Sequence, residues 1–281
     1  MSRRIPALWT SHPSSPQWHD LCQRLVGCRA CPRLVAWREE GRRRGKAAYW
    51  SRPVPGEGDP KARVLVLGMA PGMEGGNRTG RPFCGDASGR WVREALSRHG
   101  WAGGDGEPLS GVYLSNLARC VPPQNRLRAE ELARCLPYLR EELQLLGHLE
   151  VVLALGRQAF LAYLGLREDA PKTARFAHGA LVYFPTRPHW LLASYHPSPH
   201  NTGPGRLTRA MWEEIWRSVA ELAGGSGSTV DPAVLKLHQV VTPSPGQDGA
   251  EVLGHRAVGV KAVVADDVGA ADEGGVSLNR A

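Results

Sequence analysis

Four short apolar segments recur along the middle of the chain. The first covers residues 62–68 (ARVLVLG), and 111–118, 149–156 and 189–194 follow it. Near-continuous apolar character over so few residues is typical of strands that are buried on both faces, as in parallel sheets covered by helices. Each segment is therefore predicted to be a strand of one parallel sheet.

Segments with helical periodicity lie between and after these strands. Residues 89–100, 157–165 and 206–223 predict amphipathic helices. Another helix is predicted to begin near Ala129 and to break or restart at Pro137, because proline lacks an N–H donor. Alternating strands and helices with short connections predict an α/β fold, namely a three-layer α/β/α sandwich around a central, mainly parallel four-stranded sheet.

The pattern changes near residue 224. From GGSGSTV onward, Gly, Ser, Pro and acidic residues become frequent and the periodicity fades. Residues 1–224 are therefore predicted to form one folded domain, and 225–281 a mostly disordered C-terminal tail. Within the tail, 234–241 (VLKLHQVV) has the composition of a short strand or a docking segment.

Charge is distributed unevenly, since residues 1–230 hold 31 Lys/Arg against 20 Asp/Glu, whereas residues 231–281 hold 4 against 7. A basic body suggests a polyanionic partner, although a solvated basic surface has the same composition. The sequence shows neither the apolar core of a signal peptide nor the ~20 apolar residues of a membrane span. A soluble cytoplasmic protein is expected. Its six Cys suit metal binding or core packing better than disulfides in that compartment.

Three loops follow the predicted strands, where sheets of this class bind their ligands. The first, 68–89, is rich in glycine and offers Arg78 and Arg81 to a phosphate or carboxylate, and Phe83 as a flat apolar face. It has neither a P-loop nor a dinucleotide-binding glycine pattern. A nucleotide cofactor is therefore not indicated.

The other two loops are also polar. Asn116, at the end of the second strand, can present a donor and an acceptor to a base edge, or it can cap a turn. The third loop begins HPSPHN (196–201), and its prolines lower the entropy lost when a loop inserts into a partner. A lone His196 is more often structural, but two neighbouring polar loops make it a site candidate.

The cysteines form two spaced pairs. Cys28 and Cys31 make a C-x2-C pair, and Cys120 and Cys135 follow the second strand with fourteen residues between them. Two pairs predict one site with four thiolate ligands, for which structural zinc and an iron–sulfur cluster are equally suitable. The two cysteines that are expected not to be ligands are Cys22 and Cys84.

Four motifs, CRACPRL, NRTGRPFCGDASG, RCVPPQN and HPSPHNTGPGRLT, resemble in this order the uracil-DNA glycosylase superfamily, specifically its family 5 (type B) enzymes with an iron–sulfur cluster. The resemblance covers about residues 20–223. It implies an enzyme that flips uracil, or other deaminated bases such as hypoxanthine, out of DNA and hydrolyses the N-glycosidic bond, which leaves an abasic site. It also implies that Cys28, Cys31, Cys120 and Cys135 hold a 4Fe–4S cluster, with zinc as the alternative.

The same resemblance implies roles for the loops. Phe83 would stack on the extruded base, and Asn116 would hydrogen-bond its Watson–Crick edge. His196 would donate toward the base O2, where negative charge develops as the bond breaks. The loop 197–206 would fill the gap in the duplex. The residues expected to contact DNA are Arg78, Arg81, Ser198, Pro199, Asn201 and Arg206.

A carboxylate is expected to orient water and to stabilise the sugar cation. The opening GMAPG (68–72) has no carboxylate or amide, and its Ala70 and Gly72 are expected to line the base pocket. Asp86 is the family 5 candidate, unless it only caps the following helix. Glu74, where family 5 usually shows His, is the second candidate. Gly72, where Ala is common in the family, leaves room for a larger base.

Two other function classes fit the sequence less well. A non-catalytic iron–sulfur or zinc module that binds nucleic acid would not need Asp86, Asn116 and His196 together. A phosphate-dependent nucleotide hydrolase would need a cluster of metal-binding carboxylates, and these loops are poor in Asp and Glu. The loops contain no Lys, so a monofunctional enzyme without a Schiff-base step is expected. It is expected to act on DNA as a monomer.

Overall fold

The computed structural model describes residues 15–43, 49–102, 108–224 and 240–241. A seven-stranded sheet runs through them in the order β1-β3-β2-β4-β6-β5-β7. The four predicted strands form the centre of this sheet and run parallel to one another. Nearly all of their residues are buried, which explains their apolar sequences. These strands are β2 (Val64–Gly68), β3 (Val112–Asn116), β4 (Val151–Leu155) and β6 (His189–Ser194).

Three further strands, which the sequence analysis did not predict as strands of the sheet, extend its edges. β1 (Glu57–Gly58) is antiparallel to β3, β5 (Leu181–Phe184) is antiparallel to β6, and β7 (Val240–Val241) is parallel to β5. β1 and β7 are too short for any periodicity to show. β7 belongs to the segment 234–241 of the predicted tail. The disorder predicted for the rest of 225–281 concerns residues outside the described ranges.

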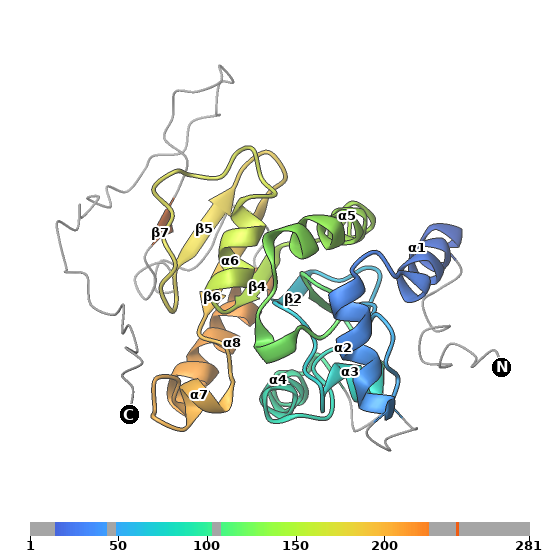
Figure 1. Ribbon diagram of the computed structural model, residues 1–281. Helices are drawn as coiled ribbons and strands as arrows, with labels where there is room; N and C mark the ends of the chain where they lie inside the picture. The colour runs from blue at the N-terminus through green and yellow to red at the C-terminus, as the bar shows by residue number, and fades with distance from the viewer. Residues whose placement is uncertain (1–14, 44–48, 103–107, 225–239, 242–281) are drawn as a thin grey trace, which may run out of the picture. The chain divides into compact units, whose positions relative to one another are not determined.

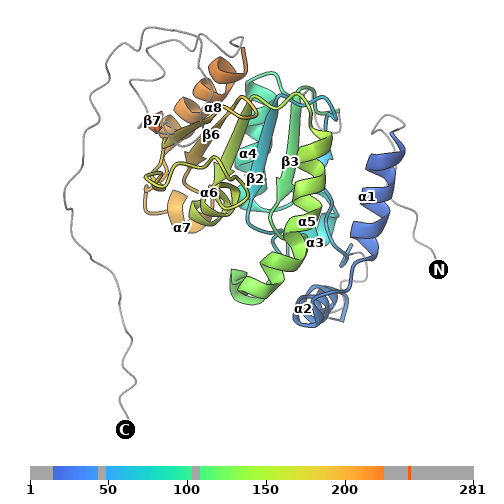
Figure 2. The ribbon, with the colours of Figure 1, turned by 90° about the horizontal axis from the view of Figure 1, so that it is seen from above.

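Helices cover both faces of the sheet, as Figures 1 and 2 show. One core cluster joins the sheet to α4 and α8 through residues such as Val66 and Trp212. A second cluster joins the other face to α1, α5 and α6 through residues such as Leu65 and Phe160. The predicted three-layer α/β/α sandwich is confirmed. The bounds are α1 Pro16–Gly27, α4 Ala87–Arg98, α5 Ala129–Leu145, α6 Arg157–Leu164 and α8 Arg209–Gly224.

The predicted break at Pro137 is wrong, because α5 continues through it. A proline inside a helix removes one N–H donor. The cost is offset here by burial of later residues of the same helix, such as Leu139 and Glu142. Helix α2 (Pro32–Arg43) was not predicted either, and the loops within the described ranges contain three short turns of helix. These are α3 (Gly76–Thr79), the 3₁₀ turn Pro123–Asn125 and α7 (Pro199–Thr202).

The carboxyl ends of the central strands meet at one edge of the sheet. Gly68 of β2 is in register with Asn116 of β3, and Leu155 of β4 with Ser194 of β6. All three loops singled out from the sequence therefore start at this edge. None of the helices in the described part of the chain has the length and apolar character of a membrane span.

Candidate active site and cysteine-lined cavity

Gly68 brings the side chains of Phe83 and Asn116 together at the end of β2. An ideal Cβ on Gly68 would lie 2.6 Å from Asn116 Oδ1 and 2.8 Å from Phe83 Cζ, so only glycine fits here. Asn116 is 3% exposed, and its side-chain amide makes no hydrogen bond within the described ranges. Because buried polar groups normally have partners, this amide is available to a ligand.

The two carboxylate oxygens of Asp86 lie in different surroundings. Oδ1 accepts a hydrogen bond from the Gly89 N–H at 2.7 Å and so caps α4, which confirms the interpretation of Asp86 as a helix cap. Oδ2 faces the first loop, where ideal Cβ atoms on Gly72 and Gly75 would lie 2.8 and 2.1 Å from it. The cap therefore leaves one oxygen beside the glycines of the loop.

His196 follows β6 and is partly buried. An ideal Cβ on Gly156, at the end of β4, would lie 3.4 Å from the Cβ of His196. Burial lowers the pKa of His196 below its ordinary 6.5, and the negative charge of Asp86 opposes this by raising it. The structure therefore brings Asp86 and His196 within electrostatic range of each other and favours a neutral imidazole, which can still donate one hydrogen bond.

The third loop is braced around the His196 carbonyl. The Ser198 N–H and Asn201 Nδ2 both donate to this oxygen at 2.8 Å. The Asn201 side chain therefore has a structural partner inside the loop. Pro199 and Arg206 are exposed, and Arg206 makes no hydrogen bond or ion pair with a described residue.

The polar residues of the first loop mostly stabilise the loop itself. Arg78 donates to the carbonyls of Glu74 and Gly85 at 2.8 and 3.0 Å. Arg81 forms an ion pair with Glu57. Glu74 is exposed, and its carboxylate accepts a hydrogen bond from the Tyr49 hydroxyl. Ala70 and Gly72, partly buried, lie between the end of β2 and α3.

A small cavity of about 20 Å³, open in part to solvent, lies between the α1–α2 junction, the segment after β3 and α5. The structure brings the four predicted ligand cysteines together in its lining, and Cys22 and Cys84 do not line it. Within the described ranges, no three Cys, His, Asp or Glu side chains are arranged to hold a single metal ion. The four lining cysteines are Cys28, Cys31, Cys120 and Cys135.

Two of these sulfurs, those of Cys120 and Cys135, accept a hydrogen bond from a described residue. Burial raises the pKa of Cys120 to about 12, and the nearby Arg38 guanidinium opposes this shift. Burial also raises the pKa of Cys31 and of Cys135. The donors are Arg38 Nη1 to Cys120 at 2.9 Å and the Arg119 backbone N–H to Cys135 at 3.3 Å.

Four residues of these sites were not predicted from the sequence, namely Arg38, Glu57, Arg93 and Tyr138. Arg38 lies seven residues after Cys31 and Tyr138 three after Cys135, and both spacings place side chains on one helix face. That signal could have been used if α2 had been predicted. Glu57 and Arg93 meet from elements that are distant in sequence, so no local pattern marks them.

The comparisons with known proteins agree with this geometry. The model of the uracil DNA glycosylase superfamily matches residues 55–220. A type-5 uracil-DNA glycosylase of Thermus thermophilus is 49% identical over 215 residues, which are 72% of this chain and 96% of the relative. One of Pyrobaculum aerophilum is 42% identical over 223 residues, 76% of this chain and 96% of the relative.

A third relative, the type-5 uracil-DNA glycosylase of Mycobacterium leprae, is 41% identical over 221 residues, which are 73% of this chain and 95% of the relative. The matched family region contains the first loop, Asn116 and His196. The chain belongs to the uracil-DNA glycosylase superfamily, and within it to the type-5 group.

Proposed function

We propose that this chain is a DNA repair enzyme that hydrolyses the N-glycosidic bond of uracil in DNA and leaves an abasic site. The observation that carries the proposal is the amide of Asn116, a residue that is 3% exposed and whose side chain makes no hydrogen bond within the described ranges, beside the ring of Phe83. An amide can pair with the Watson–Crick edge of an extruded uracil, and the ring offers a face for stacking. The family of the chain supports this substrate.

In this proposal, His196 donates a hydrogen bond to the uracil O2 as that oxygen becomes negative. A donor aimed at developing charge in a dry site stabilises the transition state. Asp86 Oδ2 orients the attacking water or stabilises the sugar cation. We favour Asp86 over Glu74, because Asp86 acts on the pKa of His196 whereas the Glu74 carboxylate is bound by Tyr49.

Contact with DNA is proposed for the outer side of the third loop. Ser198 and Pro199 would enter the space that the extruded base leaves, and Arg206, exposed and without a described partner, would hold a phosphate. Arg78, Arg81 and Asn201 have internal partners, so we assign them to loop structure first. We further propose that the chain acts on DNA in the cytoplasm, as a monomer.

We also propose that the four lining cysteines hold a 4Fe–4S cluster. A cluster distributes four thiolates over four iron atoms, which suits sulfurs that share one cavity without forming a site for a single ion. The hydrogen-bond donors on the Cys120 and Cys135 sulfurs also suit a cluster, whose properties depend on such donors. The cluster would tie three segments together. Iron and sulfide at four atoms each per chain support this, whereas one zinc without iron overturns it.

Deaminated purines such as hypoxanthine are proposed as further substrates. Gly72 puts no side chain beside Asp86, and an ideal Cβ there would stand 2.8 Å from Oδ2. The pocket is therefore wider than it would be with alanine at this position. A panel of duplexes with one altered base each tests the range, and Gly72→Ala, whose Cβ would also displace Asp86 Oδ2, should lower excision of hypoxanthine more than that of uracil.

The activity itself is tested with a labelled duplex that contains one uracil. Strand cleavage that appears only after alkali, and a loss of activity in Asn116→Ala, support a monofunctional glycosylase. A non-catalytic module would bind the duplex without producing alkali-labile sites. A covalent adduct trapped with borohydride would instead show a Schiff-base step.

A further inference from the structure

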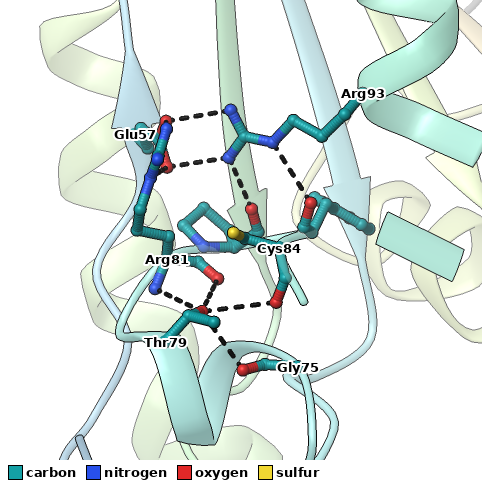
Figure 3. Close-up of polar contacts among 8 residues, drawn as sticks. Glu57, Gly75, Thr79, Arg81, Cys84 and Arg93 are labelled. Atoms are coloured by element: carbon teal, nitrogen blue, oxygen red, sulfur yellow. Dashed lines mark hydrogen bonds and ion pairs between the residues drawn. The ribbon is translucent and has the colours of Figure 1, made fainter. Parts of the chain in front are cut away.

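Two arginines hold one carboxylate beside the first loop (Figure 3). Arg93 donates from Nη1 and Nη2 to the two oxygens of Glu57 at 3.0 and 2.8 Å. Arg81 donates to the same oxygens from Nε and Nη2 at 3.1 and 2.5 Å. Such two-pronged contacts fix the direction of both guanidinium groups. Glu57 is therefore the centre of a rigid polar network.

The network is largely shielded from water. Glu57 is 8% exposed, and the side chains of Arg81 and Arg93 are each 23% exposed. Burial alone would raise the pKa of Glu57, but the hydrogen bonds from Arg81 and Arg93 outweigh it and lower that pKa. Loss of either arginine would leave a shielded charge with half of its partners.

Arg93 reaches beyond this carboxylate to the backbone that carries the ring. Its Nη2 donates to the Pro82 carbonyl at 2.8 Å, and its Nε donates to the Phe83 carbonyl at 3.1 Å. Phe83 has a φ of 49°, in the left-handed region that bulky residues rarely adopt. The surrounding structure must stabilise this conformation, and Arg93 of α4 does so through its hydrogen bonds to the two carbonyls.

Thr79 fastens the opposite side of the same loop (Figure 3). Its Oγ1 accepts from the Arg81 N–H at 3.2 Å and lies 3.1 Å from the Gly75 carbonyl and 3.3 Å from the Cys84 carbonyl. These contacts of Thr79 restrain the backbone of residues 79–84 in a compact turn.

Glu57 ties this turn to the strand of Asn116. It lies in β1, where it pairs with Leu114 of β3, two residues before Asn116. The path from Asn116 to the Phe83 carbonyl consists of backbone pairing between β3 and β1, the two-pronged ion pair of Glu57 with Arg93, and one hydrogen bond from Arg93 Nε. It ends where the ring and the amide meet over Gly68.

We propose that Glu57 and Arg93 are positioning residues that hold the ring of Phe83 at a fixed place relative to the Asn116 amide, so that one extruded base can meet both. This inference deepens the proposed function and rests on it. Neither residue touches the base. Arg81 shares the contact to Glu57, whereas the hydrogen bond to the Phe83 carbonyl comes from Arg93.

This difference provides a matched pair of variants. Arg93→Lys and Arg81→Lys each keep one positive charge and lose one fork on Glu57. We expect Arg93→Lys to lower single-turnover uracil excision about 10- to 100-fold, because misplacement of a recognition group by about 1 Å has effects of that size. Arg81→Lys should lower the melting temperature by as much as Arg93→Lys does. It should leave excision within about threefold of wild type.

A double-mutant cycle separates positioning from general damage. Phe83→Leu removes the ring, so Arg93→Lys should cost almost nothing further in the Phe83→Leu background. Additive losses in the cycle, or equal loss of excision in the two arginine variants, would overturn the proposal.

A readout without substrate separates this inference from the proposed function. The chain has four Phe, so ring-labelled [13C]phenylalanine gives few NMR signals, and Phe83→Leu identifies one of them. Arg93→Lys should shift or broaden the Phe83 signal, and Arg81→Lys should leave it near its wild-type position. An unchanged signal in Arg93→Lys refutes the positioning role. Absence of uracil excision by wild type refutes the proposed function and leaves this spectrum to decide the positioning.

Discussion

Asp86 and Gly75 can lie together only because Gly75 has no side chain, since an ideal Cβ there would stand 2.1 Å from Asp86 Oδ2. The other oxygen of Asp86 is fixed by the cap of α4. The carboxylate is thus held on one side by the start of a helix and on the other by a glycine. Its place depends on both contacts.

Replacement of this glycine should displace the carboxylate. We expect Gly75→Ala to lower uracil excision by about 100-fold, because Oδ2 must move by more than a small relaxation allows. The cap of α4 should weaken as well, by about 1 kcal/mol in the free energy of unfolding. Gly147→Ala is the control, since a Cβ on Gly147 has nothing within 4 Å. Wild-type excision by Gly75→Ala would show that the position of Oδ2 does not matter.

Charge and capping at residue 86 can be separated by one substitution. Asparagine caps helices nearly as well as aspartate, so Asp86→Asn should keep the melting temperature close to that of wild type. Its excision rate should fall by orders of magnitude if the carboxylate stabilises the sugar cation or orients water. Glu74→Gln is the matched control and should stay active. The reverse result would assign the catalytic carboxylate to Glu74.

Substitutions at the two ends of the third loop should affect different steps, namely the chemical step for His196 and DNA binding for Arg206. His196→Ala should reduce the single-turnover rate far more than DNA affinity, because its contact to O2 strengthens in the transition state. Arg206→Ala should weaken binding to every sequence and lower its salt dependence, since it removes one phosphate contact. If His196→Ala lowered affinity and rate equally, the residue would act in binding.

The sequence contained enough information for the centre of the fold. Apolar runs such as 62–68 predicted the four parallel strands. A strand that is buried on both faces is apolar along its whole length, and this pattern is visible without knowledge of the neighbouring strands. Strand ends then predicted that Asn116 and His196 share one edge of the sheet, as the register confirms. The edge strand β1 could not be found, because two residues carry no period.

The polar networks were beyond sequence reasoning for a different reason. Glu57 and Arg93 are 36 residues apart and meet only after the sheet and α4 have formed. Arg81 carried a plausible signal for DNA contact, yet the fold provides it with a shielded carboxylate. The sequence gives the charge of an arginine in a loop but not its partner. Whether that partner is DNA or a carboxylate of the protein can be decided only from a structure.

His189 provides a test of stability against pH that does not involve the proposed activity. Its ring lies between the Tyr163 hydroxyl and the Arg187 carbonyl, and burial lowers its pKa from 6.5 to about 4. Between these values the unfolded chain binds more protons than the folded chain, so stability falls as the pH decreases from 6.5 toward 4. The loss from this group is ~3 kcal/mol.

Melting temperatures between pH 8 and pH 5 measure this effect. Wild type should lose stability more steeply below pH 6.5 than His189→Gln, which has no titrating group at this position. The difference between the two curves isolates His189 from the other histidines. Parallel curves would mean that the His189 ring titrates equally in the folded and the unfolded chain.

Arg38 lines the cavity that contains the four proposed cluster ligands. This arginine is 2% exposed and donates to the Cys120 sulfur and to the Cys28 carbonyl. Lysine at this position keeps the charge but cannot make both contacts, and loss of such outer contacts weakens metal binding by about 10- to 100-fold. Arg38→Lys should therefore lose iron and visible absorbance to a chelator about tenfold faster than wild type. Arg29→Lys, at an exposed arginine paired with Glu39, should bleach at the wild-type rate. Equal bleaching of the two variants would show that Arg38 does not retain the cluster.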